Sequence, residues 1–226
     1  MKNSNKILNG LELLYPNSVI PQLKRSLEKF PESIKNMEDA FSLGQLQSKL
    51  WLIDNLPDNL GTIFVCAGWY GTLSALMFER AKNKFNKIRS FDKDESCAPI
   101  ADTLNRVHVM NGWQFKSSTL DILQMSYPLS HFTVRSDGTS ALLTEMPDTI
   151  INTSCEHILD FNAWYKNIPS GMLLILQSNN YFEIDDHVNC VQSISEFSSQ
   201  TPMSTVLYEG ELDLGKYKRF MRIGYK

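Results

Sequence analysis

Two groups of residues in this chain have types and spacing that could perform chemistry, and the first surrounds a glycine turn. The apolar run 62–67 leads into a turn with Gly68 and Gly71, and Asp92 follows 21 positions after Gly71. A glycine lets the main chain approach a ligand that a side chain would exclude, and a carboxylate can accept hydrogen bonds from both hydroxyls of a ribose. This layout is typical of a nucleotide-type cofactor site on a parallel sheet, and it predicts an enzyme.

The second group lies at the end of an apolar strand expected over residues 149–153. Asn152 could hydrogen-bond an acceptor amine or hydroxyl. Glu156 or His157 could serve as a general base, and histidine is the usual choice near neutral pH. The hydroxyl and carboxylate side chains of the same stretch would also suit the capped start of a helix. The sequence therefore leaves two interpretations open, an active site and a helix cap.

A third polar stretch, residues 177–189, follows the next expected strand. Asn179 and its two neighbours should emerge at the same sheet edge and could line an acceptor pocket. The run 185–187 (Asp-Asp-His) could suggest a metal ion, but adjacent carboxylates seldom point at one ion. We therefore expect no metal site, and we expect this run to cap a helix that passes through Ile194.

The elements that must position these groups alternate along the chain. Strands are expected over residues 62–67, 87–91, 113–117, 149–153 and 172–177. Helices are expected over residues 71–83, 96–106 and 158–165. Repeated units of strand, helix and strand imply a parallel sheet with right-handed crossovers. The predicted fold class is α/β, with a Rossmann-like and mostly parallel sheet.

Two segments depart from this alternation, and both are predicted β-hairpins. An Asp-Gly pair at 137–138 joins two strand-like arms within residues 131–144, where a crossover helix would otherwise lie. Arms over residues 205–214 and 217–225 form a long hairpin after the fifth strand. We expect this C-terminal hairpin to close the sheet edge in antiparallel fashion.

Residues 1–58 are expected to form a helical extension, and residues 59–226 the cofactor-binding domain with its hairpin insertion. Apolar residues recur at helical spacing over 22–30 and over 34–56. Such a stripe suits a layer packed on the sheet, and it also suits a lid over the substrate site. We expect a mixture of both.

Composition and charge narrow the class of protein. The chain has 226 residues, 42% of them hydrophobic, and a formal net charge of −3 at pH 7. Because no block of Lys and Arg is present, nucleic acid is not the favoured partner, although a single-stranded or flipped base is left open. The 4 cysteines have long, irregular gaps, which indicates free thiols in a reducing compartment. With neither a signal peptide nor a membrane-spanning run expected, the predicted location is cytoplasmic, away from any membrane.

A parallel sheet that ends in an antiparallel hairpin resembles the class I S-adenosylmethionine-dependent methyltransferases, whose last strands form such a hairpin. The resemblance covers roughly residues 58–226. It implies that the cofactor is S-adenosyl-L-methionine, lying across the ends of the first three strands. The family's glycine loop then falls on Ala67, Gly68, Trp69, Tyr70 and Gly71.

The resemblance also implies roles outside the loop. Asp92 corresponds to the ribose-binding acid and Asp121 to the acid that contacts adenine, while the Ile122 main-chain N–H would bond a ring nitrogen. The glycine motif is divergent, because the family usually has an acidic residue two positions before a more glycine-rich loop. Here Trp69 and Tyr70 stand inside the turn. They either contact the cofactor or the acceptor, or anchor the loop against the N-terminal helices.

The predicted function is an S-adenosylmethionine-dependent methyltransferase that acts on an unidentified acceptor, with a small molecule or a protein side chain favoured. Methyl transfer from a sulfonium needs little acid–base help because the leaving thioether is neutral, so no catalytic triad is expected. The alternatives are transfer of the aminocarboxypropyl group of the same donor, hydride transfer with NAD, and a non-catalytic accessory protein of the same fold. The sequence predicts no oligomeric state.

Overall fold

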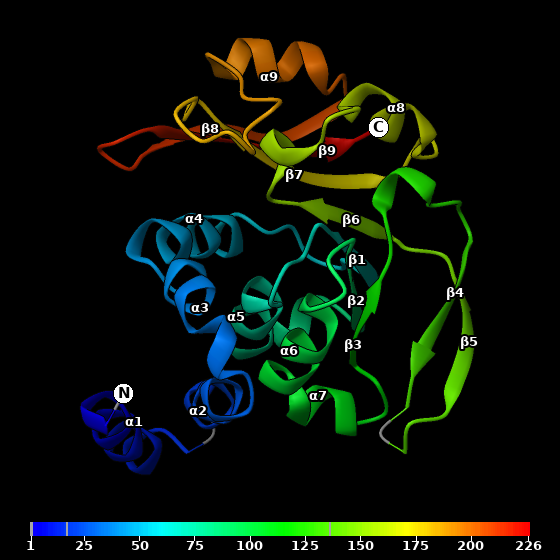
Figure 1. The fold of residues 1–226 in the computed structure, drawn as a ribbon. Helices are drawn as coiled ribbons and strands as arrows, with labels where there is room; N and C mark the ends of the chain where they lie inside the picture. The colour runs from blue at the N-terminus through cyan, green and yellow to red at the C-terminus, as the bar shows by residue number, and fades with distance from the viewer. Residues whose placement is uncertain (1, 17, 136) are drawn as a thin grey trace.

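A seven-stranded sheet in the order β3-β2-β1-β6-β7-β9-β8 forms the centre of the part of the chain that the structure describes (Figure 1). The computed structural model describes residues 2–16, 18–135 and 137–226, with side chains from residue 6 onward. Strands β1, β2, β3, β6 and β7 pair in parallel, whereas β9 runs antiparallel between β7 and β8. The predicted α/β fold, with a mostly parallel sheet and a terminal antiparallel hairpin, is confirmed. The strands are β1 Thr62–Cys66, β2 Lys87–Asp92, β3 Phe115–Thr119, β6 Thr149–Asn152, β7 Leu173–Asn179, β8 Thr205–Asp213 and β9 Lys218–Tyr225.

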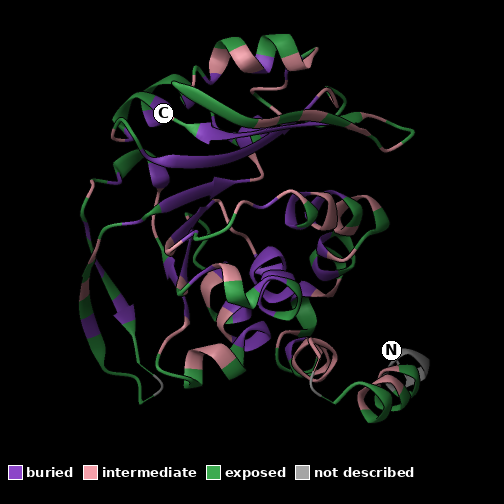
Figure 2. Ribbon diagram, turned by 180° about the vertical axis from the view of Figure 1, so that it is seen from behind, coloured by how far each residue is buried: buried purple, intermediate pink, exposed green. Residues whose placement is uncertain are grey.

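Helices cover both faces of this sheet, so the molecule has three layers. Because successive strand residues point to opposite faces, Ile63 enters the core beneath α4 and α5, and Phe64 enters the core beneath α8 and α9. Figure 2 shows the buried strands between helices whose outer sides are exposed. These helices are α4 Leu43–Asp54, α5 Thr72–Arg80, α6 Cys97–Leu104, α7 Arg106–Met110, α8 Phe161–Asn167 and α9 Ile194–Gln200.

The N-terminal segment is helical, as expected, but it is more broken than the apolar stripe suggested. The apolar residues at helical spacing over 34–56 do not form one continuous helix, because Ser42 has extended dihedral angles (φ −61°, ψ 155°) between α3 and α4. Met1 and Asn17 of the expected extension lie outside the described residues. None of the helices in the described ranges is long and apolar enough to cross a membrane. The first three helices are α1 Lys2–Leu14, α2 Ile20–Lys29 and α3 Ile34–Ala40.

A separate antiparallel pair, β4 (Leu129–Val134) and β5 (Ser140–Glu145), lies between β3 and β6 in the sequence, as the Asp-Gly signal predicted. Ser136, next to the expected turn, lies outside the described residues. The pair alternates in burial: His131 faces inward against the Phe91 ring, with 5.1 Å between ring centroids, while Phe132 faces outward. The hairpin therefore occupies the place where a crossover helix would cover this end of the sheet.

The structure corrects two predicted boundaries and one predicted helix cap. The third strand begins at Phe115 rather than at residue 113, because Gly112 and Trp113 form a turn with positive φ angles. Helix α8 begins at Phe161, three residues later than expected, since the carboxylate of Asp160 caps it through the Ala163 N–H. Helix α9 is capped by Ser193 rather than by the run 185–187.

Candidate active site

The carboxyl ends of the parallel strands bring most of the predicted site residues to one edge of the sheet. Ala67 directly follows β1, Asp92 ends β2, Asn152 ends β6 and Asn179 ends β7. Since β9 pairs antiparallel with β7, Arg219 lies opposite Asn179 at the same edge. Ligands of open α/β sheets bind outside this edge, so the structure gathers these side chains where a site is expected.

The loop after β1 folds tightly onto the end of β2. Ala67, Trp69 and Gly71 have φ angles of 54°, 47° and 71°, a region that L side chains rarely adopt. The Gly68 N–H donates to the Phe91 carbonyl at 3.0 Å, and a Cβ added to Gly68 would lie only 2.1 Å from the Ser90 hydroxyl. Gly68 therefore allows the close approach between this loop and β2.

The carboxylate of Asp92 binds the main chain of two loops. Its Oδ2 accepts a hydrogen bond from the Trp69 N–H at 2.9 Å, and its Oδ1 accepts one from the Asp94 N–H at 3.1 Å. The side chain is half-buried. A carboxylate can accept about four hydrogen bonds, so acceptor positions stay open for a ligand at the glycine loop.

Trp69 and Tyr70 point toward the N-terminal helices. Their rings stack with centroids 5.0 Å apart, and Tyr70 is buried in a small core beside Met37 of α3 and Ile100 of α6. The Tyr70 hydroxyl also accepts a hydrogen bond from the Asn36 amide at 3.2 Å. This geometry matches the anchoring interpretation for Tyr70, whereas half-buried Trp69 still has exposed surface beside Asp92.

The start of α5 has main-chain groups that suit a negatively charged ligand. Gly71 is its N-cap residue, and no side chain among the described residues caps it. The hydroxyls of Thr72 and Ser74, in the first turn, are buried and lack a hydrogen-bond partner among the described residues. Free N–H groups and the helix dipole at such a start favour a carboxylate.

Asp121 and Ile122 lie just beyond the end of β3. Oδ1 of Asp121 accepts a hydrogen bond from the Leu123 N–H at 3.0 Å and so caps the short 3₁₀ helix Ile122–Gln124. Asp121 is half-buried and Ile122 is buried. The end of β3 pairs with the end of β2, so this corner lies beside Asp92 along the same edge.

Asn152 is the last residue of β6, and only one of the two polar atoms of its buried side chain has a hydrogen-bond partner among the described residues. Its Oδ1 accepts a hydrogen bond from the Ser154 N–H at 2.8 Å, but its Nδ2 has no partner among the described residues. A buried donor without an acceptor is costly, and a bound polar ligand would remove that cost. The capping interpretation does not account for this group, because Asp160 caps α8.

Glu156 is buried in an ion pair that joins three elements. Its Oε1 accepts hydrogen bonds from Arg219 at 2.9 Å and from the Asn179 amide at 2.6 Å. Arg219 also donates to the Thr153 carbonyl at 3.1 Å. Oε1 is therefore occupied, whereas Oε2 has no partner among the described residues.

His157 follows Glu156 and lies at the surface. Its Nδ1 is 3.0 Å from the Asp186 carbonyl oxygen, and its ring meets the His187 ring edge to face, with centroids 4.6 Å apart. Desolvation by the neighbouring loop lowers the pKa of His157, and the nearby His187 acts in the same direction while Glu156 opposes it. The ring is therefore neutral at pH 7.

Sequence reasoning missed Lys49, which α4 brings to the same region. Its side chain is buried and its Nζ donates to Gln45 Oε1 at 2.5 Å. Burial lowers the pKa of Lys49 to about 7, and the positive charge of Arg219 adds to this shift. A signal was present, since Lys49 precedes the apolar Leu52 and Leu56 by three and seven residues, on the buried face of the helix.

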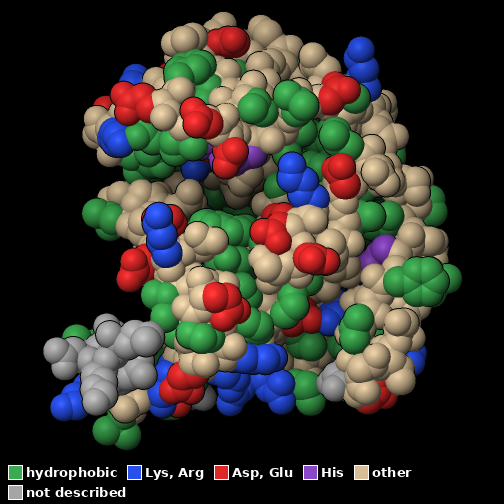
Figure 3. All heavy atoms as spheres, viewed as in Figure 1, with side chains coloured by type: hydrophobic (Ala, Val, Ile, Leu, Met, Phe, Trp, Pro, Cys, Tyr) green, Lys and Arg blue, Asp and Glu red, His purple; other side chains and the backbone are tan. Residues whose placement is uncertain are grey.

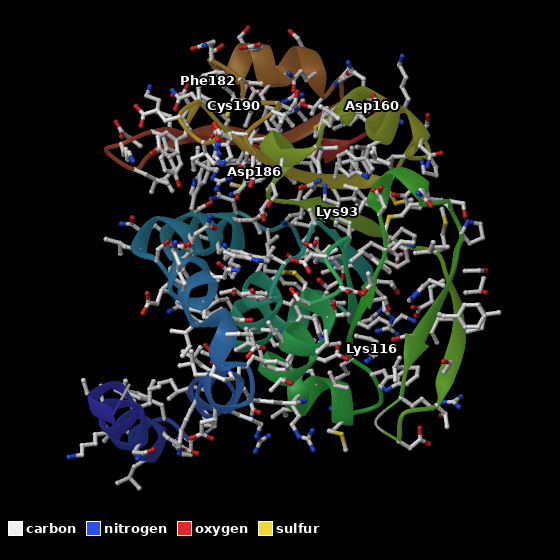
Figure 4. The ribbon with its side chains drawn as sticks, viewed as in Figure 1. Lys93, Lys116, Asp160, Phe182, Asp186 and Cys190 are labelled. Carbon is white, nitrogen blue, oxygen red and sulfur yellow. The ribbon has the colours of Figure 1, made fainter. Side chains whose placement is uncertain are left out.

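The surface is hollowed where these elements meet. Figure 3 shows the hollow between the upper layer of the view, formed by β7, β9 and α9, and the helices α4 and α5 below it. Acidic, basic and histidine side chains gather along its upper rim. Asp186 and Cys190, both labelled in Figure 4, belong to the loop after β7, in the same upper layer of the view as this rim. The arrangement could hold a polar molecule against the strand ends.

Chains of known structure share this fold. A SAM-dependent methyltransferase from Aquifex aeolicus aligns over 85% of this chain and 97% of its own, with a TM-score of 0.53 and 15% identity. The N-methyltransferase NodS from Bradyrhizobium japonicum WM9 aligns over 83% and 99%, with a TM-score of 0.52 and 12% identity. A geranyl diphosphate methyltransferase, solved with GPP and sinefungin, aligns over 79% and 78%, with a TM-score of 0.51 and 10% identity.

The strand order and these similarities define the class of structure: the chain has a Rossmann-like α/β fold that it shares with SAM-dependent methyltransferases. At identities of 9–15% the likeness establishes the fold alone. No protein-family model matches the sequence, and no curated protein matches it.

Proposed function

We propose that this chain is an S-adenosylmethionine-dependent methyltransferase. The main support is the Asp92 carboxylate, which ends β2, binds the glycine loop through the Trp69 N–H and keeps acceptor positions open. In a sheet with this strand order, a half-buried carboxylate at that position suits the two hydroxyls of a ribose. The shared fold supports the same assignment.

Different residues at the carboxyl edge of the sheet would bind different parts of S-adenosylmethionine. The main-chain carbonyls of Ala67 and Gly68, together with the uncapped start of α5 after Gly71, would bind the methionine end. Asp121 and the Ile122 N–H would bind the adenine. Trp69 would contribute its exposed surface, and Tyr70 would hold the loop in place.

S-adenosylmethionine, when bound, supplies an electrophilic methyl group whose leaving thioether is neutral. The chain would contribute mainly orientation and exclusion of water. The orphaned Nδ2 of Asn152 would donate to the acceptor or to the donor, and the α4 helix would close the site from one side. An acceptor that loses a proton could give it to Lys49, whose pKa of about 7 leaves a neutral amine in slightly alkaline solution.

His157 and Glu156 would have different roles in the reaction. His157 is exposed and its pKa is lowered by desolvation, so its ring could accept a proton at Nε2 as long as no metal ion is bound there. Glu156 is held in a buried ion pair with Arg219, so it would position its neighbours rather than take up a proton. The acceptor we favour is a small molecule or a protein side chain, because the net charge is −3.

Equilibrium binding tests this proposal without knowledge of the acceptor. S-adenosylhomocysteine should bind the purified chain in isothermal titration calorimetry, and Asp92→Asn should weaken that binding by ~10-fold or more, because a charge-assisted hydrogen bond is lost. Glu95→Gln removes an exposed charge from the same loop and is the matched control, with unchanged affinity expected. Binding of NAD in place of S-adenosylhomocysteine, or equal affinities for the Asp92 and Glu95 variants, would contradict it.

A further inference from the structure

Three side chains at the far end of the candidate site converge on one small volume. Glu156, His157 and His187 each place a ligand-type atom within 4.8 Å of those of the other two. Glu156 and His157 come from the short 3₁₀ turn after β6, and His187 comes from the loop after β7. The sequence predicts no metal site, because adjacent carboxylates seldom share an ion and no second ligand set follows the run 185–187 at a useful spacing, whereas the fold combines His187 with residues about thirty positions away.

Both histidines are oriented in the way that metal-binding histidines are. The Nδ1 atom of His157 is 3.0 Å from the Asp186 carbonyl oxygen, and that of His187 is 2.6 Å from the Tyr181 carbonyl oxygen. A carbonyl only accepts hydrogen bonds, so each Nδ1 carries a proton, which leaves Nε2 as the nitrogen that can offer a lone pair to a metal ion. Main-chain carbonyls commonly fix metal-binding histidines in this tautomer.

The carboxylate completes the set with Oε2, which has no hydrogen-bond partner in the part of the chain that the structure describes. Glu156 is 2% exposed, and its Oε1 is held by Arg219 and Asn179, yet Oε2 is buried with no partner among the described residues. A buried, charged oxygen left unsatisfied is costly. A cation on Oε2 would remove that cost, while Oε1 keeps the guanidinium neutralised.

We propose that Glu156, His157 and His187 bind one divalent transition-metal ion such as Zn²⁺, Mn²⁺ or Co²⁺. Two imidazoles with one carboxylate form a donor set suited to these ions rather than to Ca²⁺ or Mg²⁺, which prefer oxygen ligands. Cys190 lies 3.7 Å from Nδ1 of His187, but its thiol donates toward Asn179 Oδ1 and the Tyr181 carbonyl. Three protein ligands leave coordination positions open, the pattern of a reactive site rather than a purely structural one.

The position of this ion suggests what it would bind. The ligands lie at the carboxyl edge beside Asn152 and Asn179, where an acceptor would approach. An open position would then take an oxygen of the acceptor, and this step rests on the proposed methyltransferase function. The metal site itself stands on the side-chain geometry alone.

The test uses metal ions as the probe. The full chain, freed of metal with a chelator, should bind one Co²⁺ per molecule, seen as visible absorption bands, and Zn²⁺ should displace it. His157→Ala and His187→Ala should each weaken Co²⁺ binding by ~10-fold or more, because each removes a ligand. His108→Gln, in α7, is the matched control, with binding unchanged.

Thermal unfolding distinguishes the loss of a metal ligand from poor folding of a variant. Zn²⁺ should raise the Tm of the wild-type chain and of His108→Gln, but not that of His187→Ala, because an ion that binds only the folded state stabilises it. Failure of the wild-type chain to bind Co²⁺ and Zn²⁺, or wild-type affinity in both ligand variants, overturns the metal site. S-adenosylhomocysteine binding on the same samples reports on the proposed function separately.

Discussion

The chemistry of Lys49 depends strongly on its surroundings. A lysine on a helix is usually solvated, but this one is buried within range of the positive charge of Arg219. Burial lowers its pKa to about 7, so its amine is half protonated near neutral pH. Such a group can take up a proton in the pH range where most enzymes work.

The first prediction concerns the pH dependence of stability at Lys49. Its pKa is about 7 in the folded chain and 10.5 when unfolded, so between these values the unfolded state binds more protons. The free energy of unfolding therefore gains up to about 1.4 kcal/mol per pH unit from this group as the pH rises above 7. In Lys49→Met this gain is absent, and the stability difference between variant and wild type should change steadily from pH 7 to pH 9.

Urea unfolding at pH 7, 8 and 9 measures this difference. Lys35→Met serves as the control, because Lys35 is exposed on α3 and its variant should follow the wild-type pH profile. Parallel profiles for Lys49→Met and the wild type would show that the Lys49 amine is not held neutral by its surroundings.

Residues of the candidate site could be read from the sequence where the signal is local. Asp92 and Asn152 each end an apolar strand, and the order of strands alone brings them to one edge. Arg219 and Lys49 could not be found in this way. The Arg219–Glu156 ion pair joins residues 63 positions apart, and Lys49 reaches the site only because α4 packs over it. Long-range packing, which no short pattern encodes, decides these contacts.

At the scale of elements, α4 is joined to the sheet by a buried polar contact. The Ser48 hydroxyl donates to Gln177 Oε1 at 2.9 Å, and Gln177 Nε2 donates to the Ser48 carbonyl at 3.2 Å. Trp51 of α4 also donates to the Tyr208 hydroxyl of β8 at 3.1 Å. These contacts hold α4 over β7 beside the hollow, so this part of the N-terminal segment is a packed layer and also borders the candidate site.

The hairpin of β4 and β5 carries a second pH-dependent group. His131 is 6% exposed, and neither ring nitrogen has a hydrogen-bond partner among the described residues. Burial lowers the pKa of His131, with Arg89 acting in the same direction and Glu145 opposing it. Below pH 6.5 the unfolded chain therefore takes up a proton that the folded chain resists, and stability falls as the pH drops.

The second prediction follows from this position. His131→Leu should lose less stability than the wild type between pH 7 and pH 5.5, because the ring that resists protonation is gone. Phe132→Ser is the control, since Phe132 is 71% exposed on the outer face of the same strand, and its pH profile should match the wild type. Chemical denaturation at both pH values gives the comparison. An equal loss in His131→Leu and the wild type would contradict the assignment.

At the scale of the whole molecule, the sheet could be predicted and the N-terminal helices only in part. Alternation of apolar runs with helical stretches fixes a parallel sheet, because crossovers are short and of one hand. The break at Ser42 and the placing of α4 against Gln177, 129 residues away in the sequence, depend on how the layers fit together. Local pattern decides the elements, and packing decides which of them meet at the site.

The most direct test of the proposed function is a crystal structure of the chain with S-adenosylhomocysteine bound. We expect the ribose hydroxyls within hydrogen-bond distance of the Asp92 carboxylate, and the homocysteine carboxylate at the start of α5 after Gly71. Ligand density away from the carboxyl edge of β1 and β2, or an Asp92 carboxylate that binds only the Trp69 and Asp94 N–H groups while the ligand lies elsewhere, would contradict the proposal.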